Sequence, residues 1–316
     1  MPQTFDVSGQ RPLPHTPGNA ICYSGYRDGQ SPANLGFPTP GQIREDLRLL
    51  QPNFRHLRLY DCSQHALRVL QVIQQDSLPF EVMLGAYLGA EVNNPGCPWG
   101  GTHSDAALQA SIQANADELL RLVDLAGRYP HIVTSVAVGN EATVDWTDHL
   151  VPVPRMVDHV RWVRQRVAQP VTFCENYVPW QGQLDALVPE LDFLSIHTYP
   201  VWEYQAMDTA LAYTQANLAS VARCHPGKPL VITEAGWTTA SNGRGIEPHN
   251  ASVDLQSAYC QALHTWAAQA GVRVYFFEAF DEAWKGSDHP LEPEKHWGLY
   301  TADRMPKPVV QALFGR

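Results

Sequence analysis

The sequence predicts an α/β protein that folds as a (β/α)8 TIM barrel in a single domain. Two observations support this prediction. Eight short apolar segments, of the kind that forms buried parallel strands, alternate with segments of helical periodicity along the 316 residues. No Pro- or Ser-rich stretch is long enough to divide the chain. We therefore expect a polar, Pro-rich N-terminal arm at residues 1–18 and a barrel at residues 19–316.

The eight expected strands are apolar runs bounded by polar or turn-forming residues. A doubly wound open sheet is the competing architecture, and it would place a Gly-rich phosphate loop after the first strand. The segment found there is Gly25-Tyr26-Arg27-Asp28-Gly29, which lacks that motif, so the barrel is favoured. The expected strands are 19–24, 55–60, 80–88, 132–139, 170–175, 191–198, 229–234 and 272–280.

Helix signals lie between these strands. The segment from Thr39 to Gln42 reads as a capping box with Pro at the first helical position. Ser104 precedes one amphipathic segment, and Ser252 precedes another that ends at Gly271. Helical spacing also runs through Met156–Val167, Leu211–Val221 and Val309–Phe314, the last as a short helix on the outside.

The charge balance argues against two classes of partner. Acidic residues outnumber basic ones by 32 to 22, which gives a formal net charge of −10. A protein that binds nucleic acid or anionic lipid usually has a basic excess, and no run of Lys and Arg supplies one locally.

No signal peptide and no apolar run of about 20 residues is visible, so we expect no transmembrane segment. The compartment stays open between the cytoplasm and a periplasmic module cut from a longer protein.

The cysteines do not indicate a metal or redox site. Six cysteines are spread along the chain, without a Cys-x-x-Cys pair or a His-Glu-x-x-His motif. Three of them, Cys22, Cys62 and Cys174, lie in apolar runs and are expected to be buried free thiols.

Two glutamates are the strongest functional signal. Glu141 and Glu234 each end an apolar run and precede a break in the pattern, which places a carboxylate at the mouth of a strand. A pair of carboxyl groups can cleave an acetal, because one protonates the leaving oxygen and the other stabilises the oxocarbenium-like centre. At a separation of about 5–5.5 Å the second attacks the anomeric carbon and the configuration is retained. The acid is expected to be kept protonated by burial and a negative neighbour.

Other polar and aromatic side chains follow the predicted strands at the same rim, where barrel enzymes carry out their chemistry. Carboxylates, amides and flat rings suit a neutral polyhydroxylated ligand such as a sugar. We expect Asn140 to bind the sugar 2-hydroxyl, Tyr199 to donate to the nucleophilic carboxylate, and Trp237 to lie under the sugar next to the cleaved bond. The expected substrate-binding residues are Tyr26, Arg58, Tyr60, Asp61, Asn140, Glu175, Tyr199, Trp202, Trp237, Glu278, Glu282, Trp284 and Lys285.

Structural roles compete with these functional ones. Glu282 and Lys285 could form a surface ion pair, and Arg58 could pair with Asp61 across the barrel mouth. His197 is expected to form a hydrogen bond inside the barrel without binding a metal. Glu175 and Glu278 could support the site from behind, Trp237 could close the barrel top, and Trp202 and Trp284 could serve packing.

The chain resembles glycoside hydrolase family 17, the β-1,3-glucanases and related glucanosyltransferases. Its acid/base motif is matched by Val138-Gly139-Asn140-Glu141, and its nucleophile motif by Glu234-Ala235-Gly236-Trp237-Thr238. Two departures stand in the second motif, where the family has Thr and Pro at the positions of Ala235 and Thr238. Further matches are Leu57–Asp61, Tyr199-Pro200, Phe280-Asp281-Glu282-Ala283-Trp284-Lys285 and Glu294-Lys295-His296-Trp297-Gly298-Leu299.

The resemblance implies a retaining mechanism on β-1,3-glucan, with Glu141 as acid/base, Glu234 as nucleophile, and no metal or organic cofactor. The segment Tyr23–Pro32 resembles the bacterial branch of the family. Members of that branch include enzymes that transfer glucosyl units instead of hydrolysing them, and some are modules of larger membrane-bound glucan synthases.

Two other functions remain as alternatives. One is a related barrel hydrolase acting on β-1,4-linked glucan or mannan, against which the Phe280–Lys285 signature argues. The other is a carbohydrate-binding barrel that has lost catalysis. That alternative predicts a missing carboxylate, whereas both Glu141 and Glu234 are present.

Overall fold

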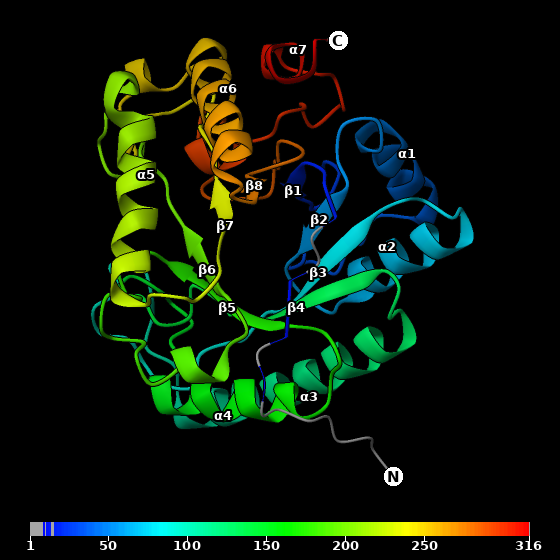
Figure 1. Cartoon of the computed structure of the whole chain (residues 1–316), viewed down its shortest axis with the longest axis vertical. Coiled ribbons are helices and arrows are strands. Elements are labelled where there is room, and N and C mark those ends of the chain that lie inside the picture. Colours follow the sequence, from blue (N-terminus) through cyan, green and yellow to red (C-terminus); the bar gives the residue numbers. More distant parts are fainter. Residues whose placement is uncertain (1–8, 10, 14–15, 316) are drawn as a thin grey trace.

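The computed structural model describes residues 9, 11–13 and 16–315, and it contains the predicted barrel (Figure 1). Eight parallel strands are hydrogen-bonded in chain order, and the last pairs with the first to close the ring. All eight predicted strands are confirmed. They are β1 (Ala20–Cys22), β2 (His56–Leu59), β3 (Glu81–Ala86), β4 (Val133–Asn140), β5 (Val171–Asn176), β6 (Leu194–His197), β7 (Leu230–Ala235) and β8 (Val274–Phe276).

Helices surround the strands as an outer ring, as Figure 1 shows. The α-helices are α1 (Pro40–Leu50), α2 (Gln64–Gln75), α3 (Asp105–Arg128), α4 (Val153–Arg164), α5 (Met207–Cys224), α6 (Val253–Ala270) and α7 (Pro308–Phe314). Three short 3-10 turns are η1 (Val188–Glu190), η2 (Pro248–Asn250) and η3 (Pro293–Lys295). The connection from β5 to β6 contains η1 where the other connections carry α-helices.

The predicted helix signals act at the positions expected. Thr39 and Gln42 form the capping box of α1, and the hydroxyls of Ser104 and Ser252 accept hydrogen bonds from the first turns of α3 and α6. Gly271 ends α6 in the left-handed conformation, with φ +66°. Several boundaries differ from the prediction: α4 stops at Arg164, β6 begins only at Leu194, and β8 is three residues long.

Helix α2 was not predicted, although its signals are present in the sequence. The Ser63 hydroxyl accepts from the backbone N–H of His65 at its N-terminus. Its buried face includes Val69, Leu70 and Ile73, which follow helical spacing.

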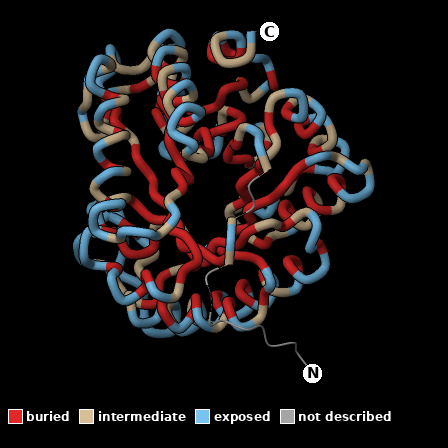
Figure 2. The backbone as a smooth tube through the Cα atoms, in the orientation of Figure 1, coloured by how far each residue is buried: buried red, intermediate tan, exposed pale blue. Residues whose placement is uncertain are grey.

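The core lies between the barrel strands and the inner faces of the helices that surround them. Figure 2 shows the buried residues as a continuous ring around the barrel, with exposed residues on the outer helix faces. Cys22, Cys62 and Cys174 are buried free thiols, as predicted. Among the described residues, no helix is both long and apolar enough to cross a membrane.

The expected N-terminal arm falls partly outside the described residues, which omit 1–8, 10, 14 and 15. Within the described part, the backbone N–H of Arg11 donates to Asp192 Oδ1 at 2.8 Å, and its guanidinium donates to the carbonyls of Gln169 and Arg164. These partners precede β5 and β6. Arg11 therefore lies at the N-terminal end of the barrel, away from the catalytic rim.

Candidate active site

A cavity of about 1240 Å³ opens at the C-terminal ends of the strands. Its size exceeds the usual range for a small-molecule pocket, roughly 300–1000 Å³, so it accommodates an extended ligand. Both Glu141 and Glu234 line it. Of the predicted site residues it also contacts Tyr26, Tyr60, Asp61, Asn140, Tyr199, Trp202, Glu282, Trp284 and Lys285.

Glu141 is directed into this cavity by an irregular end of β4. The pairing of β4 with β5 shifts register between Ala137 and Asn140. Gly139 has φ +88°, and Glu141 itself has φ +46°, which is uncommon for a residue with a side chain. Such backbone outliers concentrate at functional sites. The bend leaves the Glu141 side chain 28% exposed at the strand end.

Glu234, near the end of β7, is held on both carboxylate oxygens. Its Oε1 accepts from Arg58 Nη1 and from the Tyr60 hydroxyl, and its Oε2 accepts from the Tyr199 hydroxyl at 2.5 Å. Burial alone would raise the pKa of Glu234, but the charges of His197 and Arg58 and these hydrogen bonds lower it to about 2. The carboxylate is therefore ionised and fixed in place. The predicted contact from Tyr199 is present.

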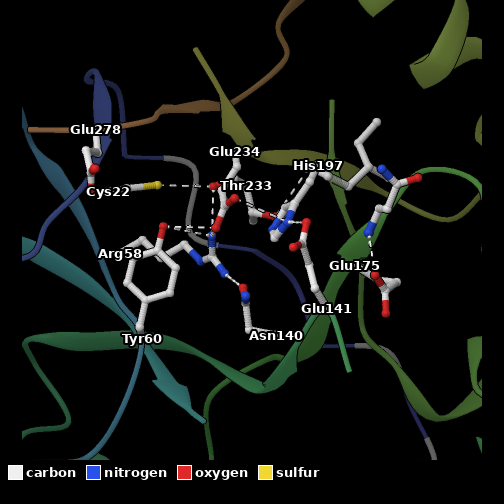
Figure 3. A network of polar contacts seen from close by, with 12 residues as sticks. Cys22, Arg58, Tyr60, Asn140, Glu141, Glu175, His197, Thr233, Glu234 and Glu278 are labelled. Atoms are coloured by element: carbon white, nitrogen blue, oxygen red, sulfur yellow. Dashed lines mark hydrogen bonds and ion pairs between the residues drawn. The ribbon is translucent and has the colours of Figure 1, made fainter. Parts of the chain in front are cut away.

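His197 joins the two glutamates (Figure 3). Its Nδ1 lies 2.8 Å from Glu141 Oε1 and 3.4 Å from Glu234 Oε2. One carboxylate oxygen from each glutamate and a ring nitrogen of His197 all lie within 4.8 Å of one another. The two carboxyl groups thus face a common point, at a spacing comparable to the roughly 5–5.5 Å typical of retaining glycosidases.

Arg58 ties Asn140 into the same network. Arg58 Nη2 donates to Asn140 Oδ1, which fixes the orientation of the amide and leaves its NH2 group toward the cavity. The possible pairing of Arg58 with Asp61 is not what the structure shows. Arg58 bonds Glu234 instead, and Asp61 Oδ1 accepts from the backbone N–H of Ser63.

A second charged cluster lies at the end of β8. Lys285 Nζ is within 2.9 Å of both Glu278 oxygens and 2.6 Å from Glu282 Oε2. Glu282 also accepts from Ser24 and from Trp284 Nε1. Burial and the Glu282 charge raise the pKa of Glu278 well above its usual range. The Glu282–Lys285 pair is therefore a buried pair at the cavity wall, which corrects the surface ion pair considered from the sequence.

Glu175 supports the site from behind and does not line the cavity. Its Oε2 accepts from the backbone N–H and hydroxyl of Thr143, and its Oε1 accepts from the backbone N–H of Asn176. Burial and the nearby Glu141 charge raise the pKa of Glu175 to about 8. It holds the segment that follows Glu141.

Trp237 does not lie where we expected it. Its side chain is fully buried, its Nε1 donates to the Asn250 carbonyl at 2.7 Å, and its ring packs near Tyr259 of α6. It is absent from the cavity wall. The β7 strand end turns Trp237 outward toward α6, so its ring packs against that helix and lies outside the cavity.

Several residues at or beside the cavity were not among the predicted site residues. His197, which is buried and does not line the cavity, was expected to form a hydrogen bond in the barrel; its contact with both glutamates was not part of that prediction. Glu294 and Trp297 belong to a motif quoted above, and no hydrogen bond from the described residues reaches the Glu294 carboxylate. Exposed aromatic rings in the β3–α3 and β4–α4 loops carry no sequence signal that separates them from surface residues. They are Tyr87, Trp99 and Trp146.

Comparison with curated proteins identifies relatives that act on glucans. A glucan 1,3-beta-glucosidase of Schizosaccharomyces pombe is 28% identical over 51% of this chain and 53% of its own length. A putative glucan endo-1,3-beta-glucosidase btgC of Aspergillus niger is 25% identical over 87% of this chain and 40% of its own length. The chain thus spans about half the length of these relatives.

Solved structures show the same barrel. An endo-laminarinase from Formosa Hel1_33_131 superposes with a TM-score of 0.74 at 26% identity, covering 90% of this chain and 84% of that one. A glycoside hydrolase family 17 β-1,3-glucanosyltransferase from Rhizomucor miehei gives a TM-score of 0.73 at 22% identity, covering 95% and 98%. The family model of the BtgE/BtgC glycoside hydrolase domain matches residues 20–298. The chain belongs to the BtgE/BtgC glycoside hydrolase domain family.

Proposed function

We propose that this protein is a retaining β-1,3-glucan hydrolase or glucanosyltransferase of the family 17 type, with Glu141 as acid/base and Glu234 as nucleophile. The observation that carries this proposal is the approach of the two carboxyl groups within 4.8 Å at the wall of one large cavity. The names of the relatives and neighbours, which refer to β-1,3-glucosidases, a laminarinase and a β-1,3-glucanosyltransferase, support the linkage.

In the first step Glu234 attacks the anomeric carbon as the glycosidic C–O bond breaks. The electron pair of that bond goes to the leaving oxygen, which takes the proton of Glu141. The fixed, ionised state of Glu234 keeps the nucleophile ready. Asn140 is placed to donate its free NH2 to the sugar 2-hydroxyl, a contact that strengthens in the transition state.

In the second step Glu141 acts as base. It removes a proton from water, or from a sugar hydroxyl, while that oxygen attacks the anomeric carbon and the bond to Glu234 breaks. Water gives hydrolysis, whereas a sugar gives transfer. The exposed rings of Tyr87, Trp99 and Trp146 lie in loops beside Glu141, where a second sugar chain would have to approach. Their flat faces favour transfer.

The bacterial branch and a role as a module of a membrane-bound glucan synthase stay predictions, since no observation on the described residues bears on them. Action on β-1,4-linked glucan or mannan and a non-catalytic carbohydrate-binding barrel stay as alternatives, and the β-1,3 names of the relatives argue against the first. The geometry of Glu141 and Glu234 favours catalysis over binding alone.

Incubation with defined β-1,3-gluco-oligosaccharides, followed by mass spectrometry and linkage analysis, tests the proposal. We expect products from β-1,3-linked sugars, with longer chains indicating transfer and shorter chains alone indicating hydrolysis. Cello- and manno-oligosaccharides serve as linkage controls. Turnover of these controls in place of the β-1,3 series would reassign the substrate, and binding without any product would support the non-catalytic alternative.

A further inference from the structure

Resting on the function proposed above, we propose that His197 is a positively charged positioning residue. It holds both catalytic carboxyl groups, and it stabilises the carboxylate form of Glu141 once Glu234 has been esterified. His197 does not line the cavity, so this role works through the two glutamates.

The position of His197 is set by the barrel itself. It is the last residue of β6, and in the ladder between β6 and β7 it stands directly opposite Glu234. Its side chain is fully buried, and its Nδ1 contacts an oxygen of each glutamate, at 2.8 Å for Glu141 and 3.4 Å for Glu234. One ring nitrogen therefore bridges the acid/base and the nucleophile (Figure 3).

The groups that face His197 come from several strands. Glu141 from β4 and Glu234 from β7 are acidic, Cys174 from β5 contributes a thiol, and Arg58 from β2 is the cation already bound to Glu234. Burial disfavours a charge on the ring, but Glu234, Cys174 and Glu141 outweigh it and raise the pKa of His197 to about 10. Arg58 reaches one Glu234 oxygen and not Glu141, so His197 is the cation that the two carboxyl groups share.

A fixed cation between these carboxyl groups has a consequence for the reaction cycle. In the resting enzyme its charge is offset by the ionised Glu234. Esterification removes the Glu234 charge, and the imidazolium then faces Glu141 alone. The carboxylate form of Glu141 is thereby stabilised in the step in which it must act as base.

The substitution His197→Asn tests the charge while keeping an amide donor near the position of Nδ1. We expect the acidic limb of the pH profile of kcat/KM to move to higher pH by about 1–3 units, because the Glu234 carboxylate loses a nearby cation. With an aryl β-glucoside that has a good leaving group, we expect breakdown of the glycosyl-enzyme intermediate to slow by about 10–100-fold. Azide, which attacks without the help of a base, should restore the rate of that breakdown.

His264→Asn is the matched control, because His264 on α6 is a partly buried histidine bonded to Asn19 and lies outside the cavity. Its pH profile should stay that of the wild type. If His197→Asn lowers activity with the acidic limb unmoved and without azide rescue, the role of His197 is structural and the inference is overturned.

Nitrogen-15 NMR of the wild-type imidazole gives a second test that needs no variant to fold. We expect both ring nitrogens of His197 to stay protonated from about pH 5 to about pH 9, beyond the ordinary range of histidine. A neutral ring at about pH 7 would overturn the inference even if the wild type turns over β-1,3-glucan. If His197 is charged but the wild type turns over none of the sugars, the proposed function is refuted instead.

Discussion

Arg58 on β2 and Glu234 on β7 form an ion pair across the interior of the barrel, with side chains only 2% and 7% exposed. The second terminal nitrogen of the Arg58 guanidinium, Nη2, donates to Asn140 Oδ1 on β4. A single buried cation thus fixes the nucleophile and the amide that precedes the acid/base. Because an unpaired charge is costly to bury, the three strand ends are held together as a unit.

Replacing Arg58 should affect both stability and the ionisation of the nucleophile. For Arg58→Met we expect a loss of about 3–5 kcal/mol in the free energy of unfolding, since Glu234 is left as a buried charge short of a partner. The acidic limb of the pH profile of kcat/KM should move to higher pH, because a cation that favours the ionised carboxylate is gone.

Denaturant unfolding and pH–rate profiles measure these two effects. The control is Arg48→Met, since Arg48 is 67% exposed and its pair with Asp76 spans 3.7 Å. Exposed pairs contribute about 0–1 kcal/mol. Equal losses for the two variants would show that burial of the Arg58 pair is not what makes it important.

The assignment of the two glutamates predicts distinct azide products. Glu141→Ala should still form the glycosyl-enzyme from a substrate with a good leaving group, and azide should then give a β-glycosyl azide. Natural oligosaccharides, which need the acid, should be cleaved about 10²–10⁴-fold more slowly. Glu234→Ala should instead give the α-glycosyl azide, because azide takes the place of the nucleophile. NMR of the products distinguishes the anomers, and the same anomer from both variants would contradict the roles assigned here.

Gly139 should tolerate no side chain. Its φ of +88° is unfavourable for alanine, and an added Cβ would lie 3.0 Å from the Met156 side chain and 3.1 Å from the Phe173 ring. We expect Gly139→Ala to lower the free energy of unfolding by about 1–3 kcal/mol and to reduce kcat, because the bend that directs Glu141 is disturbed. Gly127→Ala is the control, since an added Cβ there meets nothing within 4 Å in helix α3. Its thermal midpoint should be unchanged or higher.

Glu175 predicts a pH dependence of stability. The pKa of Glu175 is about 8 in the folded protein and about 4.5 in the unfolded chain. Between about pH 4.5 and about pH 8 the folded state therefore holds a proton that the unfolded state has released. The stabilisation is complete below about pH 4.5 and is lost as the pH rises toward about 8. Over this range the free energy of unfolding should change by a few kcal/mol in the wild type, and Glu175→Gln should remove that change.

Chemical denaturation of the wild type and Glu175→Gln at several pH values measures the difference. The exposed Glu247 provides the control variant Glu247→Gln, whose pH dependence should follow the wild type. A constant difference between wild type and Glu175→Gln across this range would mean that Glu175 is ionised in the folded protein.

The barrel and the catalytic pair were predictable because their signals are local. Each strand is a short apolar run, and parallel strands bring their C-terminal ends to one rim, so Glu141 and Glu234 could be placed together before any contact was known. Helix α2 has an equally local N-cap signal at Ser63.

What the sequence does not predict is the direction of side chains across the strands. Trp237 follows Glu234 by three residues, yet the chain turns it outward against Tyr259, a contact that depends on where α6 packs. The bridging role of His197 depends on the register between β6 and β7, which shifts just before it. Burial of Glu278 against Lys285 likewise depends on how the segment after β8 folds back.

Trp146 should influence the choice between transfer and hydrolysis. Its ring is 38% exposed at the cavity wall in the loop after β4, and its carbonyl accepts from Cys97 Sγ at 3.0 Å, which links it to the loop after β3. A flat ring there would pack against an incoming sugar, whereas water needs no such platform. For Trp146→Ala we expect the ratio of elongated to shortened products from a β-1,3-gluco-oligosaccharide to fall several-fold, with release of an aryl leaving group nearly unchanged.

Trp162→Ala is the control, because Trp162 stacks with Arg166 outside the cavity. If Trp146→Ala slows aryl release as much as it slows elongation, the ring acts on the first step and not on the acceptor.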